Sequence, residues 1–393
     1  MRNRAALPYG AVMATGLASE VAPMAHAGPL RLPLFWTAVV IAAAIGTQGA
    51  IGRRRSRHDL QPPPPLPLRF GQFTIPIGLE VLAGGLDRMG CPAALGGAAA
   101  TTAVAWTLTV VLVARVARLL ALLLAQRRGL YRVDGVWFLA PAALLADAIG
   151  VAGMTRWLPA STHDALGWLA TAALGSGSMC YAAVIVLAAI ALARSNMADH
   201  LRSSWWIAAG CGGLGAAAAG RVGAVAPFVV TAAARHAFGW AALGLWAAGS
   251  TALVPVLAGS LCFVARSRHL KGTLPWTPTF STGVYALGAG ALARRFDIPV
   301  LSTVAVAGAI AILLMWTLTV LGHLAALSTH QHGSRPDNCE GAGSARQSPP
   351  PGRSKKQTGR CHRGGPPAVP GLGRWRSGLP GTSATQSRRH RTP

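Results

Sequence analysis

The sequence predicts an all-helical polytopic membrane protein, with ten transmembrane helices arranged as five helical hairpins around a central pore. Only 12% of its 393 residues are charged, 52% are hydrophobic, and the mean hydropathy is +0.42. A soluble domain averages about 25% charged residues. Ten stretches are long enough to cross the bilayer, which takes about 20 residues for roughly 30 Å of hydrocarbon. Odd and even stretches also differ systematically in composition.

The ten predicted spans are separated by short polar or basic segments. The third span, which carries Glu80 and Asp87, and the seventh, which consists mostly of glycine and alanine, are the weakest of the ten. The spans are expected near residues 8–26, 32–51, 71–89, 95–123, 134–153, 166–193, 204–225, 233–264, 276–293 and 298–326.

The connecting segments carry an uneven distribution of Lys and Arg. With ten spans, the segments on one side hold 15 of these residues before the C-terminal tail is counted, and those on the other side hold 7. Cytoplasmic loops are the basic ones, so both termini are predicted in the cytoplasm and the protein in the cytoplasmic membrane. Basic segments beside the membrane account for the net charge of +25, and no nucleic-acid partner is predicted.

Two segments are expected outside the helical bundle. The stretch "QPPPPLPLR" (61–69) is predicted to be a polyproline-type spacer in a cytoplasmic loop. Residues 328–393 are rich in Pro, Gly, Ser and Arg, and are predicted to form a disordered basic tail. The expected division is therefore a transmembrane domain at 1–327 and a tail at 328–393.

The odd spans contain more glycine and proline than the even spans. Four of the five odd spans hold at least two glycines and four contain proline, whereas the even spans are mostly richer in large aliphatic residues. Pro and Gly belong in the interior or along a water-filled path, because their backbone groups need other partners. The odd helices are therefore predicted to be bent and to line the pore; tight packing alone is the alternative. The candidate pore-lining and helix-bend residues are Gly16, Pro76, Gly78, Pro141, Gly213, Pro278 and Gly283.

Three acidic residues lie well inside spans, and all three are on odd spans: Glu20, Glu80 and Asp147. Ionisable groups in a bilayer usually face a pathway or pair with an opposite charge. One interpretation is a structural ion pair, such as Asp147 with Arg221. The other is that a carboxyl group takes up a proton and couples its movement to a solute. These four residues are the candidates for proton or anion coupling.

Four stretches resemble a known family of membrane transporters. The segment "PYGAVMATGLAS" is similar to the first-helix opening of the tellurite-resistance/dicarboxylate transporter family, which includes plant guard-cell slow anion channels. The segments "GVWFLAPAALLADAIG", "SSWWIAAGCGGLGAAAAG" and "WTPTFSTGVYALGAGAL" resemble its fifth, seventh and ninth helices. The resemblance spans about residues 7–327, with the helices in the same order.

The resemblance implies ten helices in five hairpins, with the odd helices around a pore and often three copies in a homotrimer. It also implies that an aromatic side chain on the ninth helix plugs the pore, and the matching residue is Phe280. Three positions depart from the family pattern. Ala14 replaces a glycine, Ser281 follows Phe280 where proline is usual, and Ser204 opens the seventh helix in place of proline.

The predicted function is a transporter or channel for small anions, gated by an aromatic residue. The candidate solutes are C4-dicarboxylates, tellurite or sulfite-like oxyanions, and inorganic anions. No phosphate loop, HExxH or GxSxG motif is present, so the chain is predicted not to be an enzyme. No cofactor is expected, and no metal site, since His330, His332 and Cys339 lack the paired spacing of zinc ligands. The alternative is a membrane-embedded sensor or enzyme that uses the basic tail to bind partners.

Overall fold

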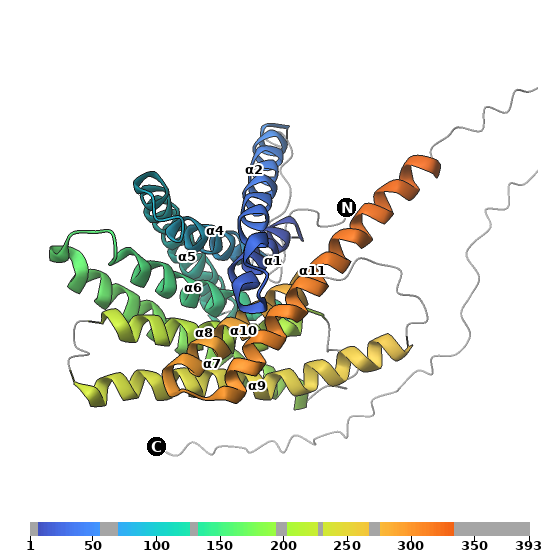
Figure 1. The fold of residues 1–393 in the computed structure, drawn as a ribbon. Helices are drawn as coiled ribbons and strands as arrows, with labels where there is room; N and C mark the ends of the chain where they lie inside the picture. Colours follow the sequence, from blue (N-terminus) through green and yellow to red (C-terminus); the bar gives the residue numbers. More distant parts are fainter. Residues whose placement is uncertain are drawn as a thin grey trace, which may run out of the picture. The chain divides into compact units, whose positions relative to one another are not determined.

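The computed structural model describes residues 7–55, 70–125, 133–193, 203–226, 231–266 and 276–333. These residues form ten α-helices and no β-strand, at the positions expected from the sequence (Figure 1). The predicted spacer at 61–69 lies outside the described residues, as does the predicted tail from residue 334 onward. The helices are α1 (Leu7–Val21), α2 (Arg31–Arg55), α4 (Thr74–Asp87), α5 (Pro92–Ala125), α6 (Leu139–Met154), α7 (His163–Ala193), α8 (Trp206–Val225), α9 (Ala232–Arg266), α10 (Trp276–Phe296) and α11 (Pro299–Gly333).

The boundaries depart from expectation at two places. Helix α1 ends at Val21, and a 3₁₀ turn at Ala22–Ala25 completes the first predicted span. Helix α11 continues to Gly333, so residues 328–333 belong to this helix and not to the tail predicted to begin at 328.

Six of the described helical segments are long and apolar enough to cross a membrane. In five of them only 17–22% of the most apolar window is buried within the protein, whereas in the segment that contains α6 the share is 83%. The chain is thus a multi-pass membrane protein with helices of two kinds. The six segments are Gly28–Gln48, Pro92–Leu122, Gly135–Met154, Ala160–Ala193, Ala232–Ala258 and Pro299–Ala325.

Helices that follow one another in the chain pack in pairs: α1 with α2, α4 with α5, α6 with α7, α8 with α9, and α10 with α11. The first members also pack on one another in a closed circuit, α1 to α4, α6, α8, α10 and back to α1. Figure 1 shows α10 beside α1 and α8, which brings the two ends of the bundle together. We call α1, α4, α6, α8 and α10 the inner helices, and α2, α5, α7, α9 and α11 the outer helices.

Glycines allow the inner helices to approach backbone to backbone. A Cβ atom on Gly213 of α8 would lie 2.5 Å from Tyr285 Cα of α10, and one on Gly288 of α10 would lie 2.8 Å from Gly213 Cα. Contacts of this kind are closed to any other residue, because the obstacle is backbone and cannot rotate away. Small residues at helix contacts are how membrane helices gain close packing without a hydrophobic driving force.

The prolines of the inner helices lie at helix starts. Pro76, Pro141 and Pro278 are each the third residue of their α-helix, and 3₁₀ turns precede α4 and α6. The first backbone N–H groups of a helix have no intrahelical partner, so proline is accommodated there without a lost hydrogen bond. These three prolines were predicted to bend the inner helices, but their position is typical of helix initiation. Pro255, in outer helix α9, lies inside its helix.

Side chains of the outer helices bond to inner helices of neighbouring pairs. Tyr181 of α7 donates to the carbonyl oxygen of Ala208 on α8 at 2.9 Å. Trp316 Nε1 of α11 donates to Thr15 Oγ1 of α1 at 2.9 Å, across 301 positions of sequence. This last bond links the last helix, α11, to the first, α1, and so adds a contact from an outer helix where the circuit of inner helices closes.

Candidate functional site

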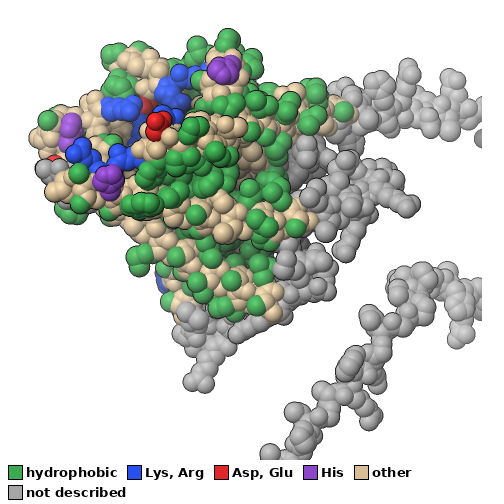
Figure 2. Space-filling model, turned by 60° about the horizontal axis from the view of Figure 1, so that its bottom comes forward, with side chains coloured by type: hydrophobic (Ala, Val, Ile, Leu, Met, Phe, Trp, Pro, Cys, Tyr) green, Lys and Arg blue, Asp and Glu red, His purple; other side chains and the backbone are tan. Residues whose placement is uncertain are grey.

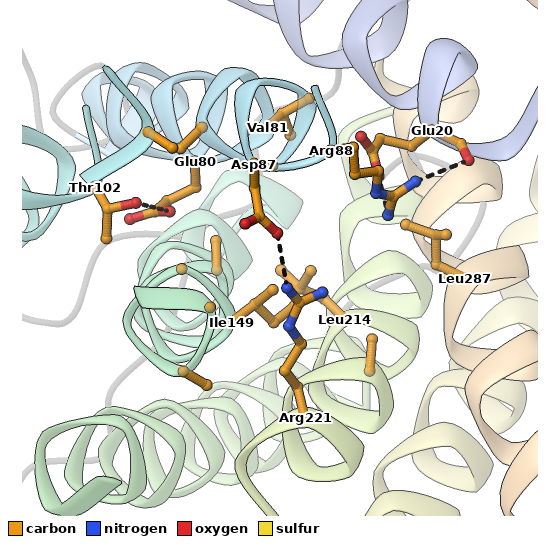
Figure 3. Close-up of a pocket in the computed structure, with 18 of the residues that line it drawn as sticks. Glu20, Glu80, Val81, Asp87, Arg88, Thr102, Ile149, Leu214, Arg221 and Leu287 are labelled. Atoms are coloured by element: carbon orange, nitrogen blue, oxygen red, sulfur yellow. Dashed lines mark hydrogen bonds and ion pairs between the residues drawn. The ribbon is translucent and has the colours of Figure 1, made fainter. Parts of the chain in front are cut away.

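A cavity of about 510 Å³ lies among the inner helices. All five inner helices and α5 contribute to its wall, and its lining residues include five arginines and three carboxylates. Figure 3 shows Glu20, Glu80 and Asp87 together with Arg88 and Arg221. The cavity extends along α10 from Phe280 to Arg295, and at 1.5 Å per residue this corresponds to about 22 Å. It is therefore a deep, narrow space with a charged end and an apolar end.

Asp87 is the centre of the charged end, which we call the mouth. It is the last residue of α4, and Trp157 Nε1, in the turn after α6, donates to its Oδ1 at 2.6 Å. Arg221 of α8 contacts Asp87 Oδ2 at 3.1 Å, and Arg156 lies 3.8 Å from the same oxygen. Figure 3 shows Arg221 reaching from α8 toward α4 to make this contact. One carboxylate thus links three inner helices.

A second ion pair joins Glu20 of α1 to Arg88, directly after α4 (Figure 3). Arg88 Nη1 also lies 3.5 Å from the backbone carbonyl oxygen of Glu20. The sequence suggested a structural ion pair between Asp147 and Arg221. In the structure Arg221 pairs with Asp87 instead. The sequence contained the signal only indirectly: Asp87 and Arg221 each lie near the end of an odd span.

The mouth carries more positive than negative charge. Arg294 and Arg295, in the last turn of α10, line it together with the arginines already described. Arg295 Nη2 donates to the backbone carbonyl oxygen of Arg235 at 3.0 Å. This acceptor is uncharged, so the bond leaves the positive charge of Arg295 in place. Figure 2 shows a face on which Lys and Arg side chains gather around acidic ones beside a largely hydrophobic surface. Such an excess of positive charge raises the local concentration of anions.

Glu80 lines the cavity in the middle of its α4 wall. Its Oε2 accepts a hydrogen bond from Thr102 Oγ1 of α5 at 3.2 Å (Figure 3). Its carboxyl group lies so close to the backbone of Gly150 on α6 that a side chain there would collide with it. Asp147, one turn earlier on α6, is fully buried beside Glu80 and does not line the cavity.

Phe280 lines the apolar end of the cavity and is only 4% exposed. The lining residues toward this end are aliphatic: Leu17, Ile77 and Leu214 from α1, α4 and α8, and Val284 from α10 itself. The first turns of α10 place Phe280 at this depth, because α10 begins at Trp276 and ends beyond Arg295 at the mouth. The ring therefore lies at the far end of the cavity from the arginines.

The predicted pore-lining residues lie at helix contacts and are absent from the wall of this cavity. Gly16 faces Val81, Gly78 faces Met13, and Gly283 faces Leu17 and Ile312, while Gly213 meets the backbone of α10. The three prolines at the starts of α4, α6 and α10 are buried. Whether these residues line a continuation of the path beyond Phe280 stays a prediction.

A comparison with protein families decides the identity. The family model for voltage-dependent anion channels matches residues 8–324, a range that includes all ten described helices except Leu7 of α1 and the last residues of α11. The chain belongs to this family. No curated protein matches the chain at a significant level.

Membership of the voltage-dependent anion channel family confirms the resemblance found in the sequence, and with it a role in anion transport in the membrane. The matched range begins in α1 and ends in α11, so the cavity lies entirely within the part shared with the family. An excess of arginine at the mouth is the electrostatic arrangement expected of a protein that admits anions.

Proposed function

We propose that the chain conducts small anions along a path between its inner helices, which they enter through the arginine-rich mouth and leave past Phe280. The observation that carries this proposal is the gradient along one cavity. Five arginines lie near the end where the inner helices finish, and a buried aromatic ring among aliphatic side chains lies at the other end.

The two ends would do different work. Arginines at the mouth attract anions, and because three of the five are paired with Asp87 or Glu20, the attraction is moderate and an anion can leave again. Conduction requires this balance between entry and release. The apolar end would close the path, because a narrow hydrophobic constriction excludes water and with it any hydrated ion.

The remaining features of the proposal follow from the sequence. The uneven distribution of basic residues predicts both termini in the cytoplasm, and the mouth would then open on the outer side of the cytoplasmic membrane. Exposed aliphatic side chains on the outer helices, such as Val254 and Leu314, would face lipid. C4-dicarboxylates, tellurite or sulfite-like oxyanions and inorganic anions are the candidate solutes, and a homotrimer is the proposed assembly.

The test of the gate is Phe280→Ala in reconstituted proteoliposomes. Removal of the ring opens the apolar end, and we expect anion flux to rise by about tenfold or more, equivalent to a barrier lowered by about 1.4 kcal/mol. Uptake of chloride, malate, sulfite and tellurite is measured separately, which also ranks the solutes.

Leu314→Ala is the matched control. It also removes a large hydrophobic side chain, but from the exposed face of α11, where the residue is 60% exposed. Its flux should equal that of the unmodified protein. Equal flux through Phe280→Ala and Leu314→Ala would remove Phe280 as the gate.

A further inference from the structure

We propose that Glu80 and Asp147 form a proton-binding site in the wall of the cavity, and that an anion passes Glu80 readily only when the pair is fully protonated. This inference rests on the proposed function, because it specifies how the anion path is controlled. The site consists of two carboxyl groups from two inner helices, α4 and α6, packed against outer helix α5.

The geometry holds the two carboxyl groups together inside the protein. Glu80 is 7% exposed and reaches the cavity, and Asp147 is completely buried behind it. The absence of a side chain at Gly150 makes room for the Glu80 carboxyl on the surface of α6, one turn from Asp147. The two carboxyl groups are close enough to interact electrostatically, with Thr109 of α5 nearby, and neither oxygen of Asp147 has a hydrogen-bond partner among the described residues.

The other polar groups around the pair are hydroxyls. Thr102 donates to Glu80 Oε2, and Thr109 faces Asp147, both from α5. From α1 the nearest acid is Glu20, which is paired with Arg88. The basic residue of helix α2 on this side, Arg31, interacts electrostatically with Glu20 and not with the pair. None of these groups is a cation placed to neutralise the pair.

The groups on α7, α8 and α10 have other partners or lie at the mouth. Tyr181 of α7 donates to Ala208, and Cys211 of α8 faces the carbonyl oxygen of Phe138, with Cys180 of α7 near it. Arg221 of α8 binds Asp87, and Arg156 lies beside it. Arg294 and Arg295 of α10 lie at the mouth, at the far end of the helix from Phe280. Within the described residues, therefore, the pair has no counter-ion.

Two adjacent carboxyl groups in a buried site without a counter-ion cannot both stay ionised, so they share a proton. The singly protonated pair still carries one negative charge, which Thr102 stabilises by donating to Glu80. This charge lies in the wall of a path for anions and repels them. A second proton removes the charge, and the wall between the mouth and Phe280 then becomes neutral.

The consequence is an anion flux that rises as the solution at the mouth becomes more acidic. Binding of a proton at Glu80 and passage of an anion past it are linked, since each favours the other through the same charge. Protonation needs no further reactant, because the proton comes from water in the cavity, which Glu80 reaches directly.

The test uses the full chain in proteoliposomes, with uptake of malate, sulfite and chloride measured between about pH 5 and pH 8, above the usual pKa range of exposed carboxyl groups. We expect uptake by the unmodified protein to rise about tenfold toward acid pH. Glu80→Gln should be fast at every pH, because the side chain in the cavity wall keeps its shape and carries no charge, and the carboxyl that remains, Asp147, does not line the cavity. In Asp147→Asn the pH dependence should move to lower pH, since one carboxyl alone no longer faces a second negative charge.

Asp164→Asn is the control, because this acid is exposed in the first turn of α7 and does not line the cavity. It should retain the pH profile of the unmodified protein. The same protein is examined by infrared spectroscopy, in which a protonated carboxyl gives a carbonyl band that appears with acid. We expect this band to be present in the unmodified protein and lost in Glu80→Gln.

The two readouts separate the two proposals. If no anion is taken up at any pH while the infrared band titrates and is lost in Glu80→Gln, the proton site stands and the proposed function fails. If anions are taken up at a rate independent of pH, or if Glu80→Gln keeps the pH dependence, the proton site is overturned while the anion path stands.

Discussion

The inner and outer helices belong to one bundle but have different surroundings: protein encloses the inner helices, whereas much of the surface of the outer helices is exposed. Across the outer helices only 17–22% of each apolar window is buried, and lipid can contact the remainder, whereas the inner segment that contains α6 is 83% buried. The other four inner helices, α1, α4, α8 and α10, do not qualify as spans by length and apolar content. The helices that surround the path are thus the ones that least resemble membrane spans.

The polar contacts differ in the same way. Each ion pair among the described residues joins two inner helices or the turns that follow them. The outer helices contribute hydrogen bonds between uncharged side chains and the inner helices, as Trp316 does with Thr15. A membrane helix carries charge at low cost only where protein or water surrounds it. Composition that looks unfavourable for lipid therefore marks the interior of the bundle.

The largest expected effect is at the glycine contacts between inner helices. Gly213→Leu places a side chain where the backbone of α10 lies, so α8 and α10 must separate. Overpacking typically costs about 1–3 kcal/mol and occasionally more, and because separating α8 from α10 also loses the rest of their contact, the cost here should exceed that of truncating any single side chain. We expect little monodisperse protein in detergent. Gly244→Leu on outer helix α9 has open space at the same atom and should give normal yield. Similar yields from both would show that the inner helices are not closely packed.

The sequence predicted much of the fold because each helix is encoded locally. Hydrophobic length, the alternation of composition between spans and the basic segments gave ten helices, most of them with ends within a few residues of those observed. It also predicted Phe280 as a pore residue, through the family resemblance, and this side chain lines the cavity. Its role as a gate stays a proposal.

The partners of charged residues were harder to predict. Whether Arg221 meets Asp87 or Asp147 depends on how α8 is rotated and shifted against α4 and α6, and one residue of shift turns a side chain by about 100°. The arginines of the mouth were visible as the few basic residues on the sparser side, but no pattern showed that they converge. The position of prolines near helix starts was local information, and it favours initiation over bending.

A smaller effect is expected from truncating one leucine in each class of helix. Leu145 of α6 is fully buried and packs against Gly177 of α7, whereas Leu314 of α11 is 60% exposed. Leu145→Ala should lower the free energy of unfolding by about 2–5 kcal/mol, because a cavity remains. Leu314→Ala should change it by less than about 0.5 kcal/mol, as expected away from packed sites. Thermal unfolding in the same detergent measures both, and equal destabilisation would contradict the division into inner and outer helices.

The smallest of these effects concerns the ion pair between Asp87 and Arg221, which joins α4 and α8, two inner helices that are not adjacent in the circuit. A hydrogen bond to a charged group contributes about 1.5–3 kcal/mol, and partial exposure of Arg221 places this pair near the lower value. The double-mutant cycle of Asp87→Asn and Arg221→Gln, followed by thermal unfolding, should give that coupling energy.

Arg221→Gln should also reduce anion uptake at low ionic strength and have less effect at high salt, because the attraction at the mouth is screened. Coupling below about 0.5 kcal/mol, with salt-independent uptake, would mean that the mouth is held by packing of the inner helices alone and that its charges do not recruit the anion.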